Sequence, residues 1–227
     1  RESDRFDKQL RRYEEALARN KDSTGVPFPE HDIGDVLAVY DRIIDEHSES
    51  DLADDALFYK ALGLRKIERF DEANDALATL CARYPRSEYF VEAKMNIGRY
   101  YFERPRIHGG KGYDLAQDAF REVLFYRDHP QFVQALYNLG WCYYMKDRYD
   151  EAIAVFRYLV EEGELEFDAG EMDRKQIVNP LLRDEAIDYL AISFDEEGKV
   201  DEAVRFLDLV GNVDYAALVL KRIGELR

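Results

Sequence analysis

The chain has 227 residues, a hydrophobic fraction of 46% and a net charge of −16. This hydrophobic fraction excludes a chain that is disordered throughout, and the length suits one large or two small domains. The negative charge opposes contact with a phosphate backbone, so we expect no nucleic-acid partner. No apolar run approaches the roughly 20 residues that cross a bilayer, so we expect no direct membrane insertion.

In the first half of the chain, apolar residues recur at steps of three and four, which is the spacing of helices. One such stripe covers residues 6–18 and ends in a loop over 20–31 that is rich in Gly, Pro and polar residues. A later pair of stripes covers 57–64 and a segment that starts at Asp71. Pro85 ends this second helix because proline cannot continue one.

The second half repeats this pairing of a first and a second helix, with two enlarged connections. A stripe over 93–101 precedes an inserted loop at 103–112, and an acidic inserted loop at 161–180 follows the pair in 132–160. In that pair Gly140 removes a side chain where the two helices approach closely. We expect 132–160 to be the best-formed pair of the chain.

A small residue early in each second helix marks an internal repeat. The separations between successive marks are 37, 43, 36 and 51 residues, and the inserted loops account for the two longer ones. Longer loops cost only about 0.6 kcal/mol per doubling of length, so they need not disturb the packing of the repeats. The marks are Val36, Ala73, Ala116, Ala152 and Ala203.

This pattern resembles the tetratricopeptide repeat, whose units place a large residue, Leu-Gly, an aromatic, Ala, an apolar or aromatic residue and Pro at fixed positions. The match is carried by Leu136, Leu139, Gly140, Tyr143, Tyr149, Ala152 and Phe156, by Leu57, Ala61, Leu64, Phe70, Ala73, Leu77 and Pro85, by Ile97, Gly98, Tyr101, Tyr113, Ala116 and Phe120, and by Ile187, Leu190, Ala191, Phe194, Ala203 and Leu207.

The resemblance implies an all-α fold, a right-handed α-solenoid of helix-turn-helix repeats. We expect about four full repeats plus a terminal partial one, in a single solenoid over residues 1–227. The expected repeats cover approximately 6–50, 54–86, 88–130, 132–162 and 183–211, with a partial repeat at 214–227.

The resemblance also implies a noncatalytic interaction scaffold that binds a peptide or partner protein in a concave groove lined by the first helices. Mapping the inward-facing places of the family gives an aromatic middle with a basic rim and an acidic C-terminal end. Trp, Tyr and Arg are frequent anchors of protein interfaces. The expected partner-binding residues are Phe58, Arg65, Met95, Asn96, Arg99, Phe102, Tyr137, Asn138, Trp141 and Tyr144.

Each of these aromatic residues has an alternative interpretation as core that packs on the adjacent repeat. We prefer Trp141 as a binding residue because Leu139, Gly140 and Tyr143 already supply the expected core there. A second hypothesis is a structural or oligomerising spacer that acts through its ends, with self-association through an exposed C-terminal helix.

The sequence predicts no catalytic residue, metal site or cofactor. Cys81 and Cys142 lack Cys-x-x-Cys spacing, and we interpret both as small buried side chains. None of the four histidines has the spacing of metal ligands. An enzyme stays the third hypothesis, because residues that are distant in sequence can converge in a fold.

Two details concern the compartment. The repeats are 36 or 37 residues long where the family usually has about 34. The phrase Tyr84-Pro85-Arg86-Ser87-Glu88-Tyr89 is similar to bacterial cell-envelope members, including an outer-membrane assembly lipoprotein and the Tol-Pal-associated type. Because the chain starts at Arg1 and not Met, we interpret it as a fragment of a larger bacterial protein. We expect the periplasm or cell envelope, with the cytoplasm as the alternative.

Overall fold

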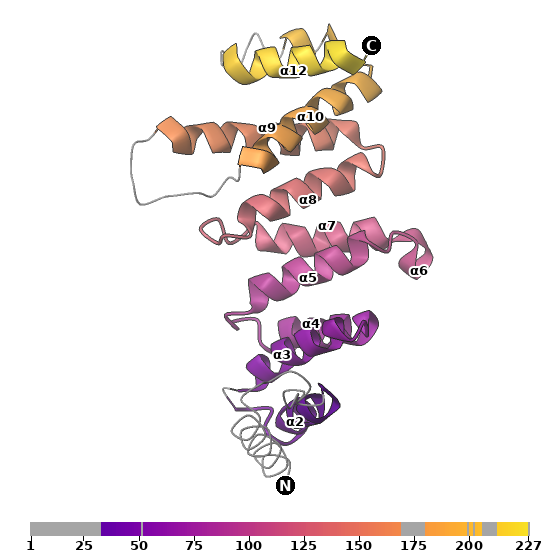
Figure 1. Cartoon of the computed structure of the whole chain (residues 1–227), viewed down its shortest axis with the longest axis vertical. Helices are drawn as coiled ribbons and strands as arrows, with labels where there is room; N and C mark the ends of the chain where they lie inside the picture. Colours follow the sequence, from indigo (N-terminus) through magenta and orange to yellow (C-terminus); the bar gives the residue numbers. More distant parts are fainter. Residues whose placement is uncertain are drawn as a thin grey trace, which may run out of the picture. The chain divides into compact units, whose positions relative to one another are not determined.

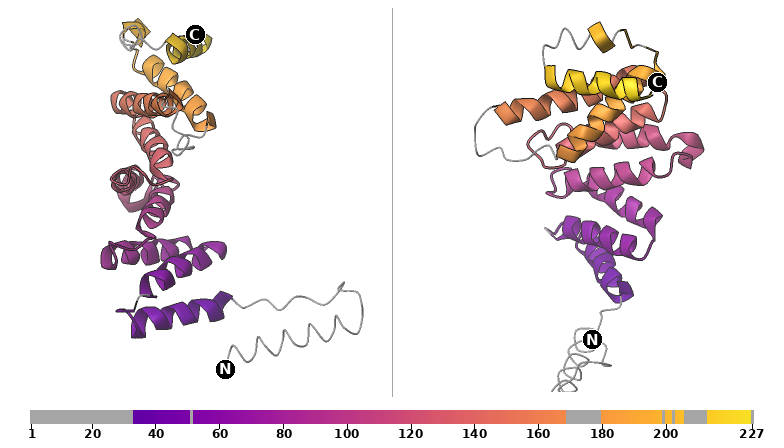
Figure 2. Two further views of the ribbon diagram at one scale, coloured as in Figure 1. Left: turned by 90° about the vertical axis from the view of Figure 1, so that its left-hand side faces the viewer. Right: turned by 45° about the horizontal axis from the view of Figure 1, so that its top comes forward.

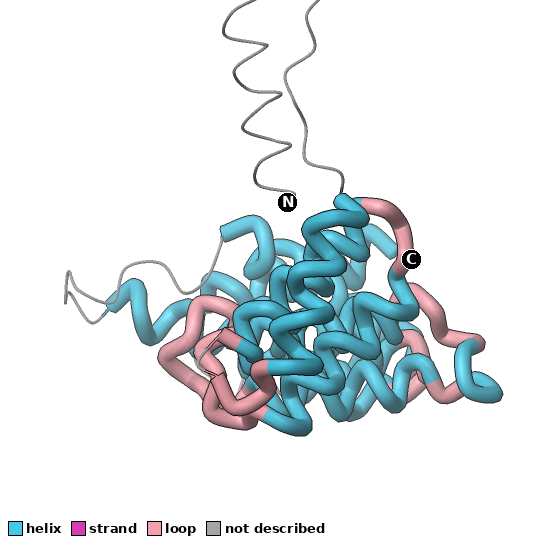
Figure 3. Tube along the Cα trace, turned by 90° about the horizontal axis from the view of Figure 1, so that it is seen from below, coloured by secondary structure: helices cyan, strands magenta, loops and turns pink. Residues whose placement is uncertain are grey.

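The computed structural model describes residues 33–50, 52–168, 180–198, 200–201, 203–205 and 213–226. The elements in these ranges are α-helices joined by turns and loops, without a strand among them (Figures 1 and 3). The predicted all-α class is therefore confirmed. The helix predicted over 6–18 and the loop predicted over 20–31 lie outside the described residues.

The chain divides into two compact units, Arg1–Ser87 and Glu88–Arg227. In the first unit α2 (Ile33–Glu46) packs on α3 (Ala53–Lys66), and α3 pairs with α4 (Phe70–Arg83). The single solenoid over 1–227 stays a prediction.

The second unit is a series of helical pairs in which each helix packs mainly on its neighbours in the sequence, as repeat proteins do. The helix α9 packs on α10, which in turn packs on α12, drawn in orange and yellow in Figure 2. The pairs are α5 (Phe90–Phe102) with α7 (Gly112–Val123) and α8 (Phe132–Tyr144) with α9 (Tyr149–Asp168), followed by α10 (Pro180–Glu196) and α12 (Val213–Leu226), and the short α6 (Ile107–Gly110) lies before α7.

The turn inside a helical pair has the same backbone geometry in three repeats. Glu68, Asp147 and Gly198 each stand five residues before the small residue that marks the repeat, and their φ angles are 62°, 55° and 69°. In the first two of these turns, the amide of the following residue donates to the carbonyl five residues earlier. This left-handed ending is a common way to terminate a helix. The repeat in the sequence therefore corresponds to a repeated turn.

In two repeats, a glycine of the first helix faces an aromatic ring of the second helix. A Cβ on Gly98 would lie 2.4 Å from Cε1 of Phe120, and a Cβ on Gly140 would lie 2.6 Å from Cε1 of Phe156. Both rings are fully buried. The glycines thus admit the rings, as the sequence predicts for Gly140.

The equivalent positions in the first unit have a different pair of side chains. The first helix α3 has Ala61 and the second helix α4 has Leu77, and both are buried. A larger residue on the first helix is thus accompanied by a smaller one on the second. The total volume at this helix contact is approximately conserved between repeats, which is what close packing requires.

The acidic loop predicted over 161–180 is wrong over 161–168, because α9 continues to Asp168. This segment contains Glu and Leu, which are good helix formers, and it has no proline to end the helix. The loop prediction rests on the acidity of the segment, and charge alone does not terminate a helix. Residues 169–179 lie outside the described residues.

We predict that Gly140→Ala lowers the free energy of unfolding by about 1–3 kcal/mol, because overpacking a tight contact forces side chains and backbone to shift. The double variant Gly140→Ala/Phe156→Leu reproduces the Ala61 and Leu77 combination. It should therefore lose less stability than the sum of the two single variants. Urea unfolding followed by circular dichroism measures all three.

The matched control is Gly224→Ala, since a Cβ at this helical glycine of α12 would meet no atom within 4 Å. This control should be neutral or stabilising by up to about 1 kcal/mol. Strict additivity of the Gly140 and Phe156 substitutions would contradict direct packing between them.

Candidate functional site

Six aromatic side chains of α8, α9 and α10 form a contiguous group, which we call the aromatic cluster. Neighbouring ring centroids lie between 4.1 and 6.4 Å apart, within the range of attractive aromatic pairs. One ring, Phe156, is fully buried, and the other five are partly exposed. The members are Tyr137, Trp141, Tyr144, Tyr149, Phe156 and Tyr189.

The spacing of three residues on α8 explains half of the cluster. Tyr137, Trp141 and Tyr144 stand at steps of four and three, so they share one stripe of the helix. A different stripe holds Gly140 and Tyr143, and it packs on α9 and α7. The helix α8 therefore has one side that joins it to its neighbours and another side that carries the aromatic cluster.

Trp141 connects two successive repeats. Its ring centroid lies 4.1 Å from that of Tyr189 on α10 and 5.8 Å from that of Tyr144. Tyr189 in turn stacks on Phe156, with centroids 5.9 Å apart and an interplanar angle of 30°. Trp141 thus packs on the next repeat and still keeps part of its side chain exposed.

Carboxylates lie at the edges of the aromatic cluster. The Tyr137 hydroxyl donates to Oε2 of Glu185 at 2.5 Å. Burial, together with this hydrogen bond, raises the pKa of Tyr137 to about 12. Burial also raises the pKa of Tyr144, and the negative charges of Glu196 and Asp147 add to the effect. These hydroxyls therefore stay protonated at neutral pH.

Two of the predicted binding residues belong to the core. Met95 is 1% exposed and Phe58 is 5% exposed, so their side chains are not available to a partner. The prediction for both is corrected, because neighbouring helices enclose these positions of α5 and α3. Arg65, Arg99 and Phe102 are partly exposed and lie on the same two helices, outside the aromatic cluster.

The two predicted asparagines form hydrogen bonds along their own helices. Nδ2 of Asn96 donates to the backbone oxygen of Glu92 at 2.8 Å, and Oδ1 of Asn138 accepts from Nε2 of Gln134 at 3.2 Å. Both side chains are partly exposed. These bonds fix the side-chain orientations and use part of the capacity of each amide, so a role in holding a peptide backbone stays a prediction.

Sequence reasoning missed Tyr189 and assigned Phe156 to the core alone. The repeat alignment could have indicated Tyr189 as part of the site, because it occupies the position in its repeat that Asn138 occupies in the preceding repeat. A residue at that position of α10 can reach Trp141 of α8, since these successive first helices also touch each other. Recognising this requires knowledge of which positions meet between repeats.

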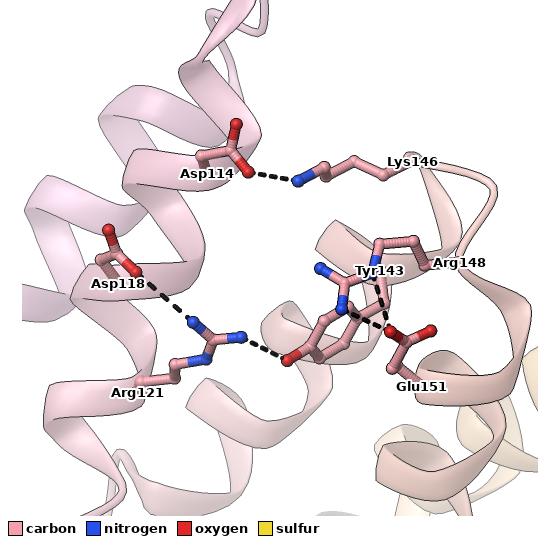
Figure 4. A network of polar contacts seen from close by, with 7 residues as sticks. All are labelled: Asp114, Asp118, Arg121, Tyr143, Lys146, Arg148 and Glu151. Atoms are coloured by element: carbon pink, nitrogen blue, oxygen red, sulfur yellow. Dashed lines mark hydrogen bonds and ion pairs between the residues drawn. The ribbon is translucent and has the colours of Figure 1, made fainter.

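A polar network joins α7 to the turn between α8 and α9 (Figure 4). Nη2 of Arg121 donates to the hydroxyl of Tyr143 at 2.6 Å, and the Arg148 guanidinium lies 4.8 Å from the centroid of the same ring. Partly exposed ion pairs contribute at most about 1 kcal/mol each, so we assign this network to the junction of two repeats. It comprises Asp114, Asp118, Arg121, Tyr143, Lys146, Arg148 and Glu151.

Within the described ranges, no group of three or more His, Cys, Asp or Glu side chains is placed to hold a metal ion. Cys81 and Cys142 are not joined in a disulfide, and both side chains are buried, as the sequence predicts. Burial raises the pKa of Cys142 to about 12, which suppresses its thiolate at neutral pH. No helix of the described part is both long and apolar enough to cross a bilayer.

Comparison with known proteins supports the repeat assignment. Models of the tetratricopeptide repeat match two segments of the chain, residues 55–87 and residues 110–167. A search of curated proteins found no significant match.

Solved structures show the same fold at low sequence identity. A crystal structure of MamA is 16% identical, with a TM-score of 0.53 over 85% of this chain and 86% of that chain. A second MamA structure, from AMB-1, is 16% identical, with a TM-score of 0.54 over 100% of this chain and 91% of that one. A putative kinesin light chain of Podospora anserina with TPR-like repeats is 11% identical, with a TM-score of 0.53 over 97% and 94%. The predicted fold of tetratricopeptide repeats is therefore confirmed.

We predict that Glu185→Gln lowers the pKa of Tyr137 but leaves it above the ordinary value of about 10, because burial is the larger cause and persists. The raised pKa also sets the pH dependence of stability. The contribution of Tyr137 is complete below about pH 10 and is lost as the pH rises through about 12. NMR of isotope-labelled tyrosine follows this titration.

The control for this titration is Glu103→Gln, an exposed carboxylate on the turn after α5. It should leave the Tyr137 titration unchanged. A pKa that returns to the ordinary value in Glu185→Gln would show that the carboxylate, and not burial, is the main cause.

Proposed function

We propose that this chain is a noncatalytic protein–protein interaction scaffold that binds a peptide segment of a partner protein on the aromatic cluster. The observation that carries the proposal is the gathering of five partly exposed aromatic side chains, around Trp141, on two consecutive first helices and the helix between them. Partly exposed Trp and Tyr side chains supply much of the binding energy at protein interfaces.

The position of the cluster agrees with the inner surface that the resemblance implies. In tetratricopeptide repeats the first helices line the concave side, and four of the six aromatic residues belong to the first helices α8 and α10. The proposed groove extends to other predicted contact residues on first helices of the second unit, which are Asn96, Arg99, Phe102 and Asn138. Arg65, on the first helix α3 of the first unit, stays a predicted contact residue of that unit.

We further propose that the chain belongs to a protein of the bacterial cell envelope, with the cytoplasm as the alternative compartment. The support is the phrase from Tyr84 to Tyr89. Its first residue also has a structural role, because the Tyr84 hydroxyl donates to the backbone oxygen of Ser48 at 2.6 Å and joins the end of α4 to the turn after α2. The compartment proposal therefore rests on the rest of the phrase.

One observation favours the alternative of an oligomerising spacer. The helix α12 packs on α10 and buries Tyr215, Val219 and Ile223. It also exposes apolar side chains, since Leu218 is 42% and Leu220 is 38% exposed. These two leucines flank the buried stripe on its two edges, so a second copy of the chain that packs along α12 would cover them.

To test the peptide-binding proposal, we would select binders from a library of random short peptides on the native chain. We predict that Trp141→Ala/Tyr144→Ala weakens the selected peptides at least about 30-fold, because anchors of this kind contribute about 2 kcal/mol or more each. Fluorescence anisotropy of labelled peptides measures the affinity.

Phe125→Ala is the matched control, since this aromatic side chain is 84% exposed and lies in the turn before α8. The milder Trp141→Phe variant preserves packing if the double variant unfolds, and circular dichroism checks both. Unchanged affinity in the folded variants would remove the aromatic cluster as the binding site.

For the alternative, we predict that Leu218→Glu/Leu220→Glu shifts any dimer towards monomer, because two charges on an apolar interface oppose association. Analytical ultracentrifugation across a range of concentrations measures this. Leu181→Glu, at a leucine of α10 that is 68% exposed, is the control. A native chain that sediments as a monomer at every concentration would rule out self-association through α12.

A further inference from the structure

We infer that the partner segment carries a positive charge and places a lysine or arginine side chain over the rings of the aromatic cluster around Trp141 and Tyr144. This inference rests on the proposed function and adds the chemical class of the ligand. Three features of the described residues lead to it: the orientation of the rings, the sign of the charges around them, and the placement of nearby basic residues.

The rings around Trp141 stand nearly perpendicular to one another. The interplanar angle is 77° between Tyr137 and Trp141 and 84° between Trp141 and Tyr144. Such rings form walls that face in different directions. The face of an aromatic ring attracts cations, most strongly for Trp, and perpendicular aromatic walls are suited to surround an ammonium or guanidinium group.

The charges beside the cluster are carboxylates of α10 and of the turn after α8. Glu185 accepts a hydrogen bond from the Tyr137 hydroxyl. The Tyr149 hydroxyl donates to Oδ1 of Asp147 at 3.0 Å. Glu185, Glu196 and Asp147 are exposed. They therefore bring negative charge to the edges of a partly exposed aromatic surface.

The raised pKa values of the tyrosines also indicate negative charge beside the aromatic cluster. Negative charge disfavours ionisation of a neighbouring phenol, and Glu185 contributes in this way to the raised pKa of Tyr189, after burial. A fourth carboxylate, Asp188, is paired with Nε of Arg222 at 2.7 Å, so its charge is balanced. Among the described residues, Glu185, Glu196 and Asp147 form no ion pair, so their negative charge is not balanced there.

The basic side chains of the turn after α8 belong to the opposite junction. Lys146 pairs with Asp114 of α7, and Arg148 pairs with Glu151 while its guanidinium stacks on Tyr143 (Figure 4). The cations of this turn are therefore paired with carboxylates at the junction with α7 and α9, away from the aromatic cluster. A basic segment is attracted by this arrangement and by the net charge of −16, whereas an acidic segment is repelled.

The experiment compares the sequences selected from the random peptide library on the native chain and on Trp141→Ala. Peptides that require Trp141 should be enriched in lysine and arginine. Replacing the basic residue of such a peptide by glutamine should weaken binding about tenfold, the size expected for a desolvated cation on aromatic rings. Quenching of Trp141, the single tryptophan of the chain, reports contact at the cluster.

The matching change on the protein is Glu185→Gln/Glu196→Gln. Its control is Glu103→Gln/Asp118→Asn, which removes the same net charge at carboxylates elsewhere. We expect the first variant to weaken the basic peptides several-fold and to flatten their salt dependence, and the control to retain native affinity.

The outcomes separate this inference from the proposed function. Peptides that require Trp141 but show no preference for basic residues, or bind equally well to both double variants, overturn the inference and leave the peptide-binding scaffold in place. A selection that yields no Trp141-dependent peptide overturns both. Equal weakening by the two double variants would assign the effect to net charge and not to the cluster, which also overturns the inference.

Discussion

The close approach of α8 and α9 at Gly140 determines where the aromatic cluster lies. Because Gly140 has no side chain, the Phe156 ring is fully buried against α8. That ring then supports Tyr137, with centroids 6.2 Å apart, and Tyr189, with centroids 5.9 Å apart. Trp141 packs on Tyr189 in turn. The position of a partly exposed surface therefore depends on a contact inside the core.

One stripe of α8 packs on neighbouring helices and stabilises the fold, and the other stripe carries the proposed binding surface. Gly140 and Tyr143 face α9 and α7, so changes there act on stability. Trp141 and Tyr144 lie on the other stripe and keep exposed surface, so changes there should act more on binding. The separation is incomplete because Trp141 also packs on α10. A binding assay on this helix therefore needs a stability measurement beside it.

The sequence predicted the repeat phase well because the phase depends on local features, such as Gly140 and the small residues that mark each second helix. It did not predict the burial of Met95 and Phe58, because a consensus place sets the direction of a side chain but not how far the neighbouring helices cover it. Tyr189 was missed for a related reason: its partners lie in the preceding repeat, and only the packed structure shows which side chains meet.

The acidic edge of the aromatic cluster links the binding of a cation to the titration of the tyrosines in the cluster. Glu185 and Asp147 are held beside tyrosine hydroxyls whose pKa they help to raise, after burial, at Tyr137 and Tyr144. The same electrostatics link ligand and proton: a cation that is stabilised by these carboxylates also favours the ionised phenol, so its binding lowers the raised pKa. Reciprocally, binding of the cation strengthens as those tyrosines ionise. The charge of the ligand can therefore be tested by measuring the pKa of Tyr137 and Tyr144 with and without the ligand.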